Sequence, residues 1–303
     1  MLDGVSLDQL RTFVVAVDEG SFSAAGRRLG RAQSAISELV RGLEAQLGVQ
    51  LFDRTGRYPQ LTTAGTALLV SARDVVAGVD AMKSRAKGMA AGLEPELSVV
   101  VDVFFPIEAL AVVAREFREQ FPAVPLRVHV EALGATFQPV LDRQASVGIV
   151  GFVPLTPPGI ITEPLVNIAF AMVAAADHPL AARNDVISHS DLAEHVQLVL
   201  TDRSELSKGR DFGVFSPKTW KLADLFAKRA FLLNGLGWGG MPLHTVQSDL
   251  DSGRLVRLHI EEEPVGGVSM LMSAVYRVDA PPGPAGRWLI ERIMACSKHR
   301  QHV

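Results

Sequence analysis

A long run without proline, Thr63–Met89, divides the chain into two parts with different sequence patterns. Its apolar residues recur at alternating spacings of four and three, at Leu68, Ala72, Val75, Val79, Met82, Ala86 and Met89. Such a heptad seam is typical of a helix that packs against a partner helix, and at 1.5 Å per residue this one would be ~40 Å long. A long helix packed on its own domain is the alternative, but the charged residues around the seam favour pairing. The pattern therefore predicts a dimer whose paired helices join an N-terminal to a C-terminal domain.

The residues before this helix contain three shorter helical patterns. The first helix is expected at Leu7–Asp18, and the second at Ala24–Leu29 with Ser23 as its N-cap. The third is expected to begin near Ala32 and to end at Gly48. A short turn between the second and third helices is the pattern of a helix-turn-helix.

A polar stripe lies on the third helix, opposite its apolar residues, and consists of Gln33, Ser34, Ser37 and Arg41. In a helix-turn-helix the N-terminal residues of this helix touch base edges in the major groove of DNA. Gln33 can make a bidentate contact to adenine, and short serine side chains bind bases or phosphates without crowding. A surface helix with polar residues by chance remains the alternative at this point.

The segment after the third helix predicts a small hairpin, or wing. Two short apolar runs, 49–52 and 58–61, flank a loop that carries Arg54, Thr55 and Arg57. The whole chain has a net charge of −3, but residues 27–57 carry six arginines, Arg31 among them, against three acidic residues. A wing with cations at its tip can reach a neighbouring phosphate backbone, so this segment favours DNA binding.

The run SFSAAGRRLGRAQSAISELVRGLEAQLGVQLFDRTGRYPQLTTAG resembles the N-terminal winged helix-turn-helix of LysR-type transcriptional regulators over about sixty residues, and the later layout fits as well. The family usually has alanine where Gly26 stands. Serine is common at the position of Ala32, proline at that of Ser34 and arginine at that of Glu38. The missing hydroxyl at Ala32 removes a phosphate contact, and Glu38 repels phosphate unless it accepts from a cytosine amino group. We therefore expect an unusual target sequence.

The resemblance implies an α+β multidomain protein: a winged helix-turn-helix, a linker helix and a two-lobed α/β domain like a periplasmic binding protein. It implies a homodimer or homotetramer that binds an inverted-repeat operator in double-stranded DNA and responds to a small-molecule effector between the lobes. The expected bounds are 1–62 for the DNA-binding domain, 63–92 for the linker helix and 93–303 for the effector domain, with lobe I at 93–164 plus 267–303 and lobe II at 165–266.

The C-terminal two hundred residues alternate strand and helix patterns, which predicts a parallel sheet with helices on both faces. A helix is expected at 221–234. In such a fold ligands bind at the carboxyl ends of strands, which gives the candidate effector residues Phe104, Phe105, Thr136, Phe152, Thr201, Asp202, Ser204 and Trp238. The aromatic residues could equally be core. Asp102 lies near enough to disfavour anions, and the polar stretch 201–220 is either a solvated loop or a segment that orders around a ligand.

Other classes of protein have little support. The single cysteine, Cys296, excludes an internal disulfide, and the histidines lack metal-ligand spacing, so we expect no metal site and no cofactor. The nucleophile and phosphate-loop motifs of enzymes are absent. No signal peptide or membrane span is recognisable, which predicts a cytoplasmic location. An architectural DNA protein remains the alternative, although it would need no cleft.

Overall fold

The computed structural model describes residues 4–55, 59–151, 156–183, 185–206, 213–261, 264 and 267–300. The chain divides into two compact units, residues 1–87 and 88–303, and each has its own hydrophobic core. Within the described ranges, no helix is both long and apolar enough to cross a membrane.

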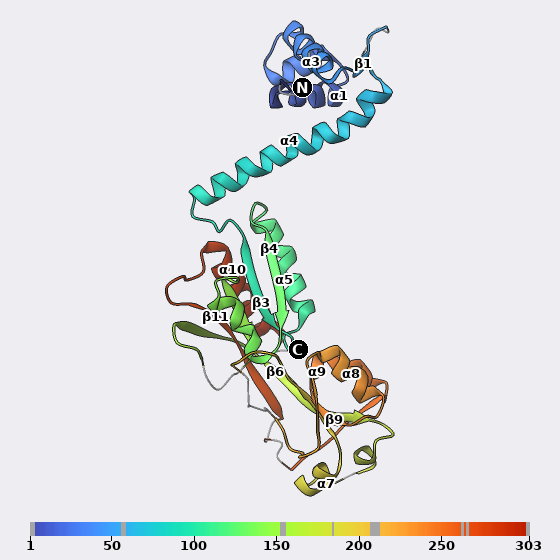
Figure 1. The fold of residues 1–303 in the computed structure, drawn as a ribbon, viewed down its shortest axis with the longest axis vertical. Coiled ribbons are helices and arrows are strands. Elements are labelled where there is room, and N and C mark those ends of the chain that lie inside the picture. The colour runs from blue at the N-terminus through green and yellow to red at the C-terminus, as the bar shows by residue number, and fades with distance from the viewer. Residues whose placement is uncertain are drawn as a thin grey trace. The chain divides into compact units, whose positions relative to one another are not determined.

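Three helices form the first unit's helix-turn-helix, α1 (Leu7–Asp18), α2 (Phe22–Leu29) and α3 (Gln33–Leu47) (Figure 1). The second helix begins two residues earlier than expected because Ser21, and not Ser23, caps it: the Ser21 hydroxyl accepts a backbone N–H in the first turn at 3.2 Å. Apolar side chains from all three helices, among them Phe13, Phe22, Ile36 and Leu43, are buried together with Phe52 of the following strand.

The turn between α2 and α3 is tight at Gly26. The Arg31 backbone N–H donates to the Gly26 carbonyl at 2.8 Å. A Cβ atom added at Gly26 would lie 2.7 Å from the Arg31 carbonyl oxygen, closer than real Cβ contacts. Glycine at this position therefore allows the two helices to approach, although it is intrinsically poor in a helix.

The wing has a short antiparallel ladder, in which β1 (Phe52–Asp53) pairs with β2 (Gln60–Leu61). Its base is fixed to α3 through Glu44, whose carboxylate accepts the backbone N–H groups of Leu51 and Phe52 at 2.9 and 3.1 Å. The predicted hairpin is present, with shorter strands than the apolar runs indicated.

The long helix α4 (Thr63–Ala90) follows the wing without a spacer. Thr62 caps it, because its hydroxyl accepts the Gly65 backbone N–H at 2.9 Å and donates to the carbonyl oxygen of Gln50 at 2.6 Å. A Cβ atom at Gly65 would lie 2.1 Å from the Leu51 carbonyl oxygen. The first turn of α4 and the wing are therefore in direct backbone contact.

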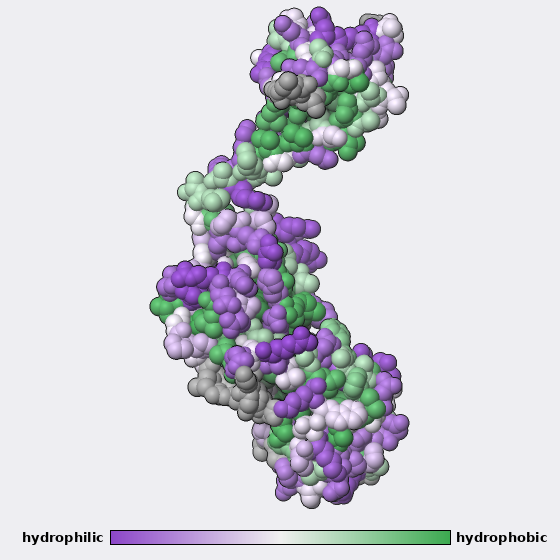
Figure 2. All heavy atoms as spheres, viewed as in Figure 1, coloured by the Kyte–Doolittle hydropathy of each residue, from purple (hydrophilic) through white to green (hydrophobic). Residues whose placement is uncertain are grey.

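The heptad seam of α4 has two environments. Leu68 and Ala72 pack into the core of the first unit. Farther along, Val75, Met82 and Met89 are 49%, 63% and 51% exposed. Figure 2 shows hydrophobic surface where α4 lies. The far part of the seam is therefore an uncovered apolar stripe on the described chain.

The second unit is built on one mixed sheet, with nine strands among the described residues, rather than on the all-parallel sheet expected. Its strands are β3 (Leu97–Asp102), β4 (Leu126–Glu131), β5 (Val147–Val150), β6 (Ile160–Ala175), β7 (Gln197–Leu200), β8 (Thr219–Leu222), β9 (Trp238–Pro242), β10 (Leu255–Arg257) and β11 (Val268–Arg277). β3 is parallel to β4 and β5, and β7 is parallel to β8 and β9. The long strands β6 and β11 are antiparallel to each other and to their neighbours.

These two long strands join two lobes. In lobe I, β11 pairs with β5 through residues 273–275, and in lobe II, β6 pairs with β9 through residues 170–174. Lobe I thus contains β3, β4 and β5, and lobe II contains β7, β8 and β9 (Figure 1). The two-lobed α/β architecture predicted from the sequence is confirmed.

Helical segments cover both faces of the sheet in each lobe, and on the second face of lobe II they contribute Leu180 and Leu192 to the core around Trp238. In lobe I, α5 (Ile107–Gln120) and α10 (Pro284–Arg300) lie on one face, and α6 (Gln138–Leu141) lies on the other. In lobe II, α8 (Leu225–Leu233) and α9 (Leu243–Asp251) pack together on the sheet.

Two short 3-10 helices, η1 (Leu133–Thr136) and η2 (Pro179–Ala182), and α7 (His189–Glu194) complete the described elements. The helix expected at 221–234 is wrong at its start, because residues 219–222 form β8 and Asp224 caps α8 by accepting the Ala227 N–H at 2.6 Å.

Candidate DNA interface and effector cleft

The first turn of α3 presents a polar, exposed surface. Gln33 and Ser34 are exposed, whereas Ile36, Val40 and Leu43 on the opposite side are fully buried. Ala32 occupies the N-cap without a side-chain hydrogen bond, so the first backbone N–H groups of α3 are not capped by that residue. Within the described residues, no side-chain hydrogen bond engages Gln33 or Ser34. Both side chains are therefore available to a partner.

Ser37 is placed differently from its neighbours on the predicted stripe. Its side chain is buried, with the residue 9% exposed, and its hydroxyl accepts from Arg41 Nη2 at 3.4 Å. Arg41 itself is exposed. The geometry makes Ser37 a support for the Arg41 guanidinium rather than part of the exposed surface.

The arginines around α3 differ in whether they form ion pairs within the chain. Three of them form ion pairs within the chain, namely Arg28 with Glu19 at 2.6 Å, Arg31 with Asp8 at 2.7 Å and Arg54 with Glu44 at 2.7 Å. Arg27 instead donates to the Ser23 hydroxyl at 3.1 Å and has no carboxylate partner in the described part of the chain. Arg27 is a candidate that the motif alone did not single out, although it belongs to the basic segment.

The described side of the wing is held by local contacts. The Arg54 guanidinium lies 5.5 Å from the centre of the Phe22 ring. The Thr55 backbone N–H and hydroxyl both donate to Asp53, at 2.8 and 2.7 Å, and they lower the pKa of this carboxyl. Arg57, predicted at the tip, lies outside the described residues.

In the second unit, a cavity of about 750 Å³ opens between the two lobes. The carboxyl ends of β3 and β4 contribute Asp102 and Glu131, and the segment after β7 contributes Asp202. The N-terminal turns of α5 and α8 close its sides. Its wall also includes apolar residues, among them Phe105, Leu225 and Met241. This is where the fold predicts a ligand, at the carboxyl ends of strands.

The structure brings some of the predicted effector residues to this cleft. Phe105 and Asp202 line it. Ser204 lies against the wall, where its hydroxyl donates to Asp202 Oδ2 at 2.8 Å. Thr201 is half-buried, and its hydroxyl donates to the Asp202 carbonyl oxygen at 3.4 Å. Phe152 lies outside the described residues.

Other predicted residues lie in the core instead. The Phe104 ring packs edge-on against Phe170 with centroids 5.1 Å apart. Thr136 is fully buried and donates to the Leu133 carbonyl at 2.5 Å. Trp238 is fully buried in the core of lobe II. Thr136 lies in η1 and Trp238 is the first residue of β9, so neither stands at the carboxyl end of a strand, and their side chains pack in the core.

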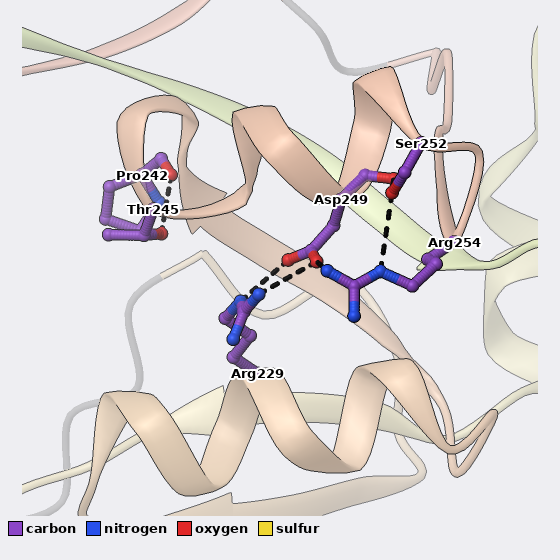
Figure 3. Close-up of polar contacts among 6 residues, drawn as sticks. All are labelled: Arg229, Pro242, Thr245, Asp249, Ser252 and Arg254. Carbon is purple, nitrogen blue, oxygen red and sulfur yellow. Dashed lines mark hydrogen bonds and ion pairs between the residues drawn. The ribbon is translucent and has the colours of Figure 1, made fainter.

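The cleft also contains charged residues that the sequence reasoning passed over, among them Arg229 on α8, which is held by an ion pair. It donates to Asp249 through Nε at 2.6 Å and through Nη2 at 2.8 Å. Arg254 donates to the same carboxylate at 2.5 Å. Asp249 is fully buried, so the two guanidiniums supply its compensating charge (Figure 3). The spacing of these residues along the chain gives no signal of this cluster.

A second cavity of about 720 Å³ lies between α5, β6, α9 and α10. It shares Phe105 and His244 with the cleft and is mostly apolar. Its charged groups, Glu116 and Arg292, form an ion pair with each other. The cleft, with several charged groups at strand ends, has more of the polar groups that orient a ligand.

Comparison with known proteins agrees with this geometry. Residues 7–66 match the family of bacterial regulatory helix-turn-helix proteins of the lysR type, and residues 90–296 match the LysR substrate binding domain. The HTH-type transcriptional activator AllS of Salmonella paratyphi A is 28% identical over 253 residues, which are 82% of either chain. The HTH-type transcriptional regulator AceR of Acinetobacter baumannii is 24% identical and covers 95% of this chain and 96% of its own.

A solved structure of an OxyR mutant from Corynebacterium glutamicum has the same fold. It aligns with a TM-score of 0.58 at 23% identity, over 98% of this chain and 93% of that chain. The two family matches cover both units, and they include the helix with the exposed polar start and the domain with the cleft. The sequence prediction of a regulator, and not an enzyme, is therefore confirmed. The chain belongs to the LysR family and is a DNA-binding transcriptional regulator with an effector-binding domain.

Proposed function

We propose that Gln33, Ser34 and Arg41 read the operator from the major groove. The observation that carries this proposal is the exposed, uncapped first turn of α3, on which Gln33 and Ser34 have no intramolecular side-chain bond within the described residues. An amide side chain there can make two hydrogen bonds to adenine, and free backbone N–H groups at a helix start bind phosphate. Ser37 acts indirectly, by orienting Arg41.

The phosphate contacts come from the arginines of the first unit. Arg27 is available without breaking an ion pair, whereas Arg31 and Arg54 must exchange a carboxylate for a phosphate. The Arg31–Asp8 pair is exposed and worth about 0–1 kcal/mol, so Arg31 exchanges its partner at little cost. The Arg54–Glu44 pair is less accessible, with Glu44 only 11% exposed, so it costs more to break. Arg57 and Thr55 on the wing add contacts beside the groove.

The uncovered stripe on α4 supports a homodimer, in which two copies of α3 read two half-sites of an inverted repeat. Further contacts between effector domains would give a homotetramer. We assign residues 1–62 to DNA binding, 63–92 to dimerisation and 93–303 to effector binding, with the lobe bounds expected from the sequence. The regulator acts in the cytoplasm, where its DNA is.

A small-molecule effector in the cleft changes DNA binding or activation. Because β6 and β11 join the lobes, a ligand held by both lobes changes their relative orientation. Such a ligand shifts the regulator only if it binds the two arrangements with different affinities.

The test is capture of sheared genomic DNA by the full-length protein at physiological salt, followed by sequencing. We expect a few enriched sites that contain an inverted repeat. Gln33→Ala should cost about 1–3 kcal/mol of binding free energy and relax specificity at one base pair in each half-site. Gln46→Ala is the matched control, since Gln46 is also exposed but lies near the other end of α3.

Two results would contradict the proposal. Uniform recovery of all fragments would indicate an architectural DNA protein without an operator. Equal weakening of all sequences by Gln33→Ala would show that this side chain contacts phosphate and does not read a base.

A further inference from the structure

The cleft is acidic among the described residues that line it. Five carboxylates face it, Asp102, Glu108, Glu131, Asp202 and Asp224. On the described wall only two guanidiniums accompany them, those of Arg203 and Arg229. Arg229 shares the buried carboxylate of Asp249 with Arg254, so part of its charge is offset there. The described wall therefore has an excess of negative charge, which attracts cations and repels anions.

Asp102 is the least ordinary of these carboxylates. It is 1% exposed at the end of β3, and its Oδ1 accepts the Phe104 backbone N–H at 2.9 Å. Its Oδ2 is buried and has no hydrogen-bond partner among the residues that the structure describes. Burial raises the pKa of Asp102 to about 7, and the nearby charge of Asp202 adds to this, although the backbone N–H groups of Phe104, Gly151 and Leu133 act in the other direction. These N–H groups act on the carboxylate without completing a hydrogen bond of ordinary geometry to Oδ2, and a buried acceptor in this state gains from a further donor.

Asp202 approaches from the other lobe. It follows β7 of lobe II, and its Oδ2 accepts the Ala135 backbone N–H of lobe I at 2.7 Å as well as the Ser204 hydroxyl at 2.8 Å. These two bonds fix the orientation of the carboxylate. Asp102 and Asp202 thus place one carboxylate from each lobe on the wall of the same cavity.

We propose that the effector is a small organic cation, with a protonated amine or guanidinium group that binds between Asp102 and Asp202. Its apolar part packs on Phe105, Leu225 and Met241 of the same wall. The cation supplies the donor that Asp102 Oδ2 lacks, and it draws together two groups that belong to different lobes. This inference rests on the proposed role of the cleft as the effector site.

The test uses calorimetry and thermal unfolding of the full-length protein with four probes of one carbon skeleton: butylamine, diaminobutane, butanol and butyrate. We expect the two amines to bind and to raise the unfolding temperature, and butanol and butyrate to do neither. Asp102→Asn should weaken amine binding by about 30-fold or more, as expected when one partner of a desolvated charge pair is lost. Asp142→Asn, at an exposed position directly after α6, should leave binding unchanged.

The pH dependence gives a second readout that does not depend on a variant that folds. A cation favours the ionised form of Asp102, so amine affinity should rise with pH up to and through about 7, with release of a proton on binding below that pH. The charged groups that line the cleft together with Asp102 are Glu108, Glu131, Asp202, Asp224, Arg203 and Arg229, and of these Asp202 acts on the Asp102 carboxyl. His244 also lines the cleft, and burial lowers its pKa, while the charge of Glu108 acts in the other direction.

Several outcomes would overturn the inference. These are tighter binding of butyrate than of butylamine, amine binding that survives both Asp102→Asn and Asp202→Asn, or no amine binding at millimolar concentration. Operator binding by the same unliganded preparation separates the two proposals. If the protein binds its operator and an anion occupies the cleft, only the proposal that the effector is a cation is contradicted. If a genomic operator is never found, the proposed function itself fails.

Discussion

Replacing Asp249 by alanine should destabilise the effector unit more than any exposed substitution does. The change removes three charge-assisted hydrogen bonds, two from Arg229 and one from Arg254. Each such bond contributes about 1.5–3 kcal/mol, so the gross loss is roughly 5–9 kcal/mol.

The net loss is smaller for two reasons. The arginine side chains are 32% and 57% exposed, and water therefore replaces part of what they lose. The cost of burying the Asp249 carboxylate also disappears, which returns several kcal/mol. We expect a net decrease of about 2–4 kcal/mol in the free energy of unfolding, equivalent to a fall of roughly 5–15 °C in Tm for a unit of this size.

The assay is tryptophan fluorescence during thermal unfolding of the full-length protein. All three tryptophans, at 220, 238 and 288, belong to the effector unit, so the signal follows that unit without a contribution from the DNA-binding unit. Asp251→Asn is the control, since Asp251 is exposed on the same helix and should move Tm by less than about 2 °C. Equal Tm values for Asp249→Ala and the control would refute the reasoning that the cluster stabilises the lobe.

Three further predictions concern other parts of the molecule. Gly26→Ala should lower the midpoint of unfolding monitored by helical circular dichroism, because the added Cβ would lie 2.7 Å from a backbone oxygen. Gly78→Ala, with no described atom within 4 Å of the added Cβ, should raise that midpoint. A higher midpoint for both variants would show that the turn at Gly26 accommodates the added methyl group. Met82→Lys should shift dimers toward monomers in sedimentation, since this exposed side chain lies in the proposed seam, and an unchanged sedimentation coefficient would exclude this helix as the interface. The pKa of Glu163 is held below its usual range by Arg287, so the pair's stabilisation is present at neutral pH and is lost as the pH falls through the lowered pKa. Glu163→Gln should therefore flatten the acid side of the stability profile, and an identical profile would contradict this origin.

The sequence predicted the elements whose signals are local. The apolar spacing of α3 and the proline-free run of α4 each specify their helix with residues a few positions apart. The mixed order of the sheet could not be predicted in this way. A strand's neighbours depend on contacts between residues far apart in the sequence, and β6 and β11 pair across about one hundred residues.

The site residues show the same contrast between local signals, which the sequence contains, and contacts that depend on the tertiary fold. The exposed polar start of α3 follows directly from helical periodicity, so Gln33 and Ser34 lie where the pattern places them, on the face opposite Ile36. At the strand ends of the effector unit, a shift of one position along the chain decides whether a side chain lies in the cleft or in the core. Phe105 therefore lines the cleft while its neighbour Phe104 packs inside.

Because Gly65 packs directly against the backbone of Leu51, the wing and α4 form one rigid unit. A helix of 28 residues is about 42 Å long, so a tilt of this rigid unit by about 5° displaces one end of the helix by roughly 4 Å relative to the other. A flexible linker would bend and so would not transmit such a tilt, whereas the direct backbone contact between α4 and the wing transmits it. In the proposed dimer, a small change in the angle between two α4 helices therefore produces a larger change in the distance between the two half-sites, and the length of this helix sets the size of that change.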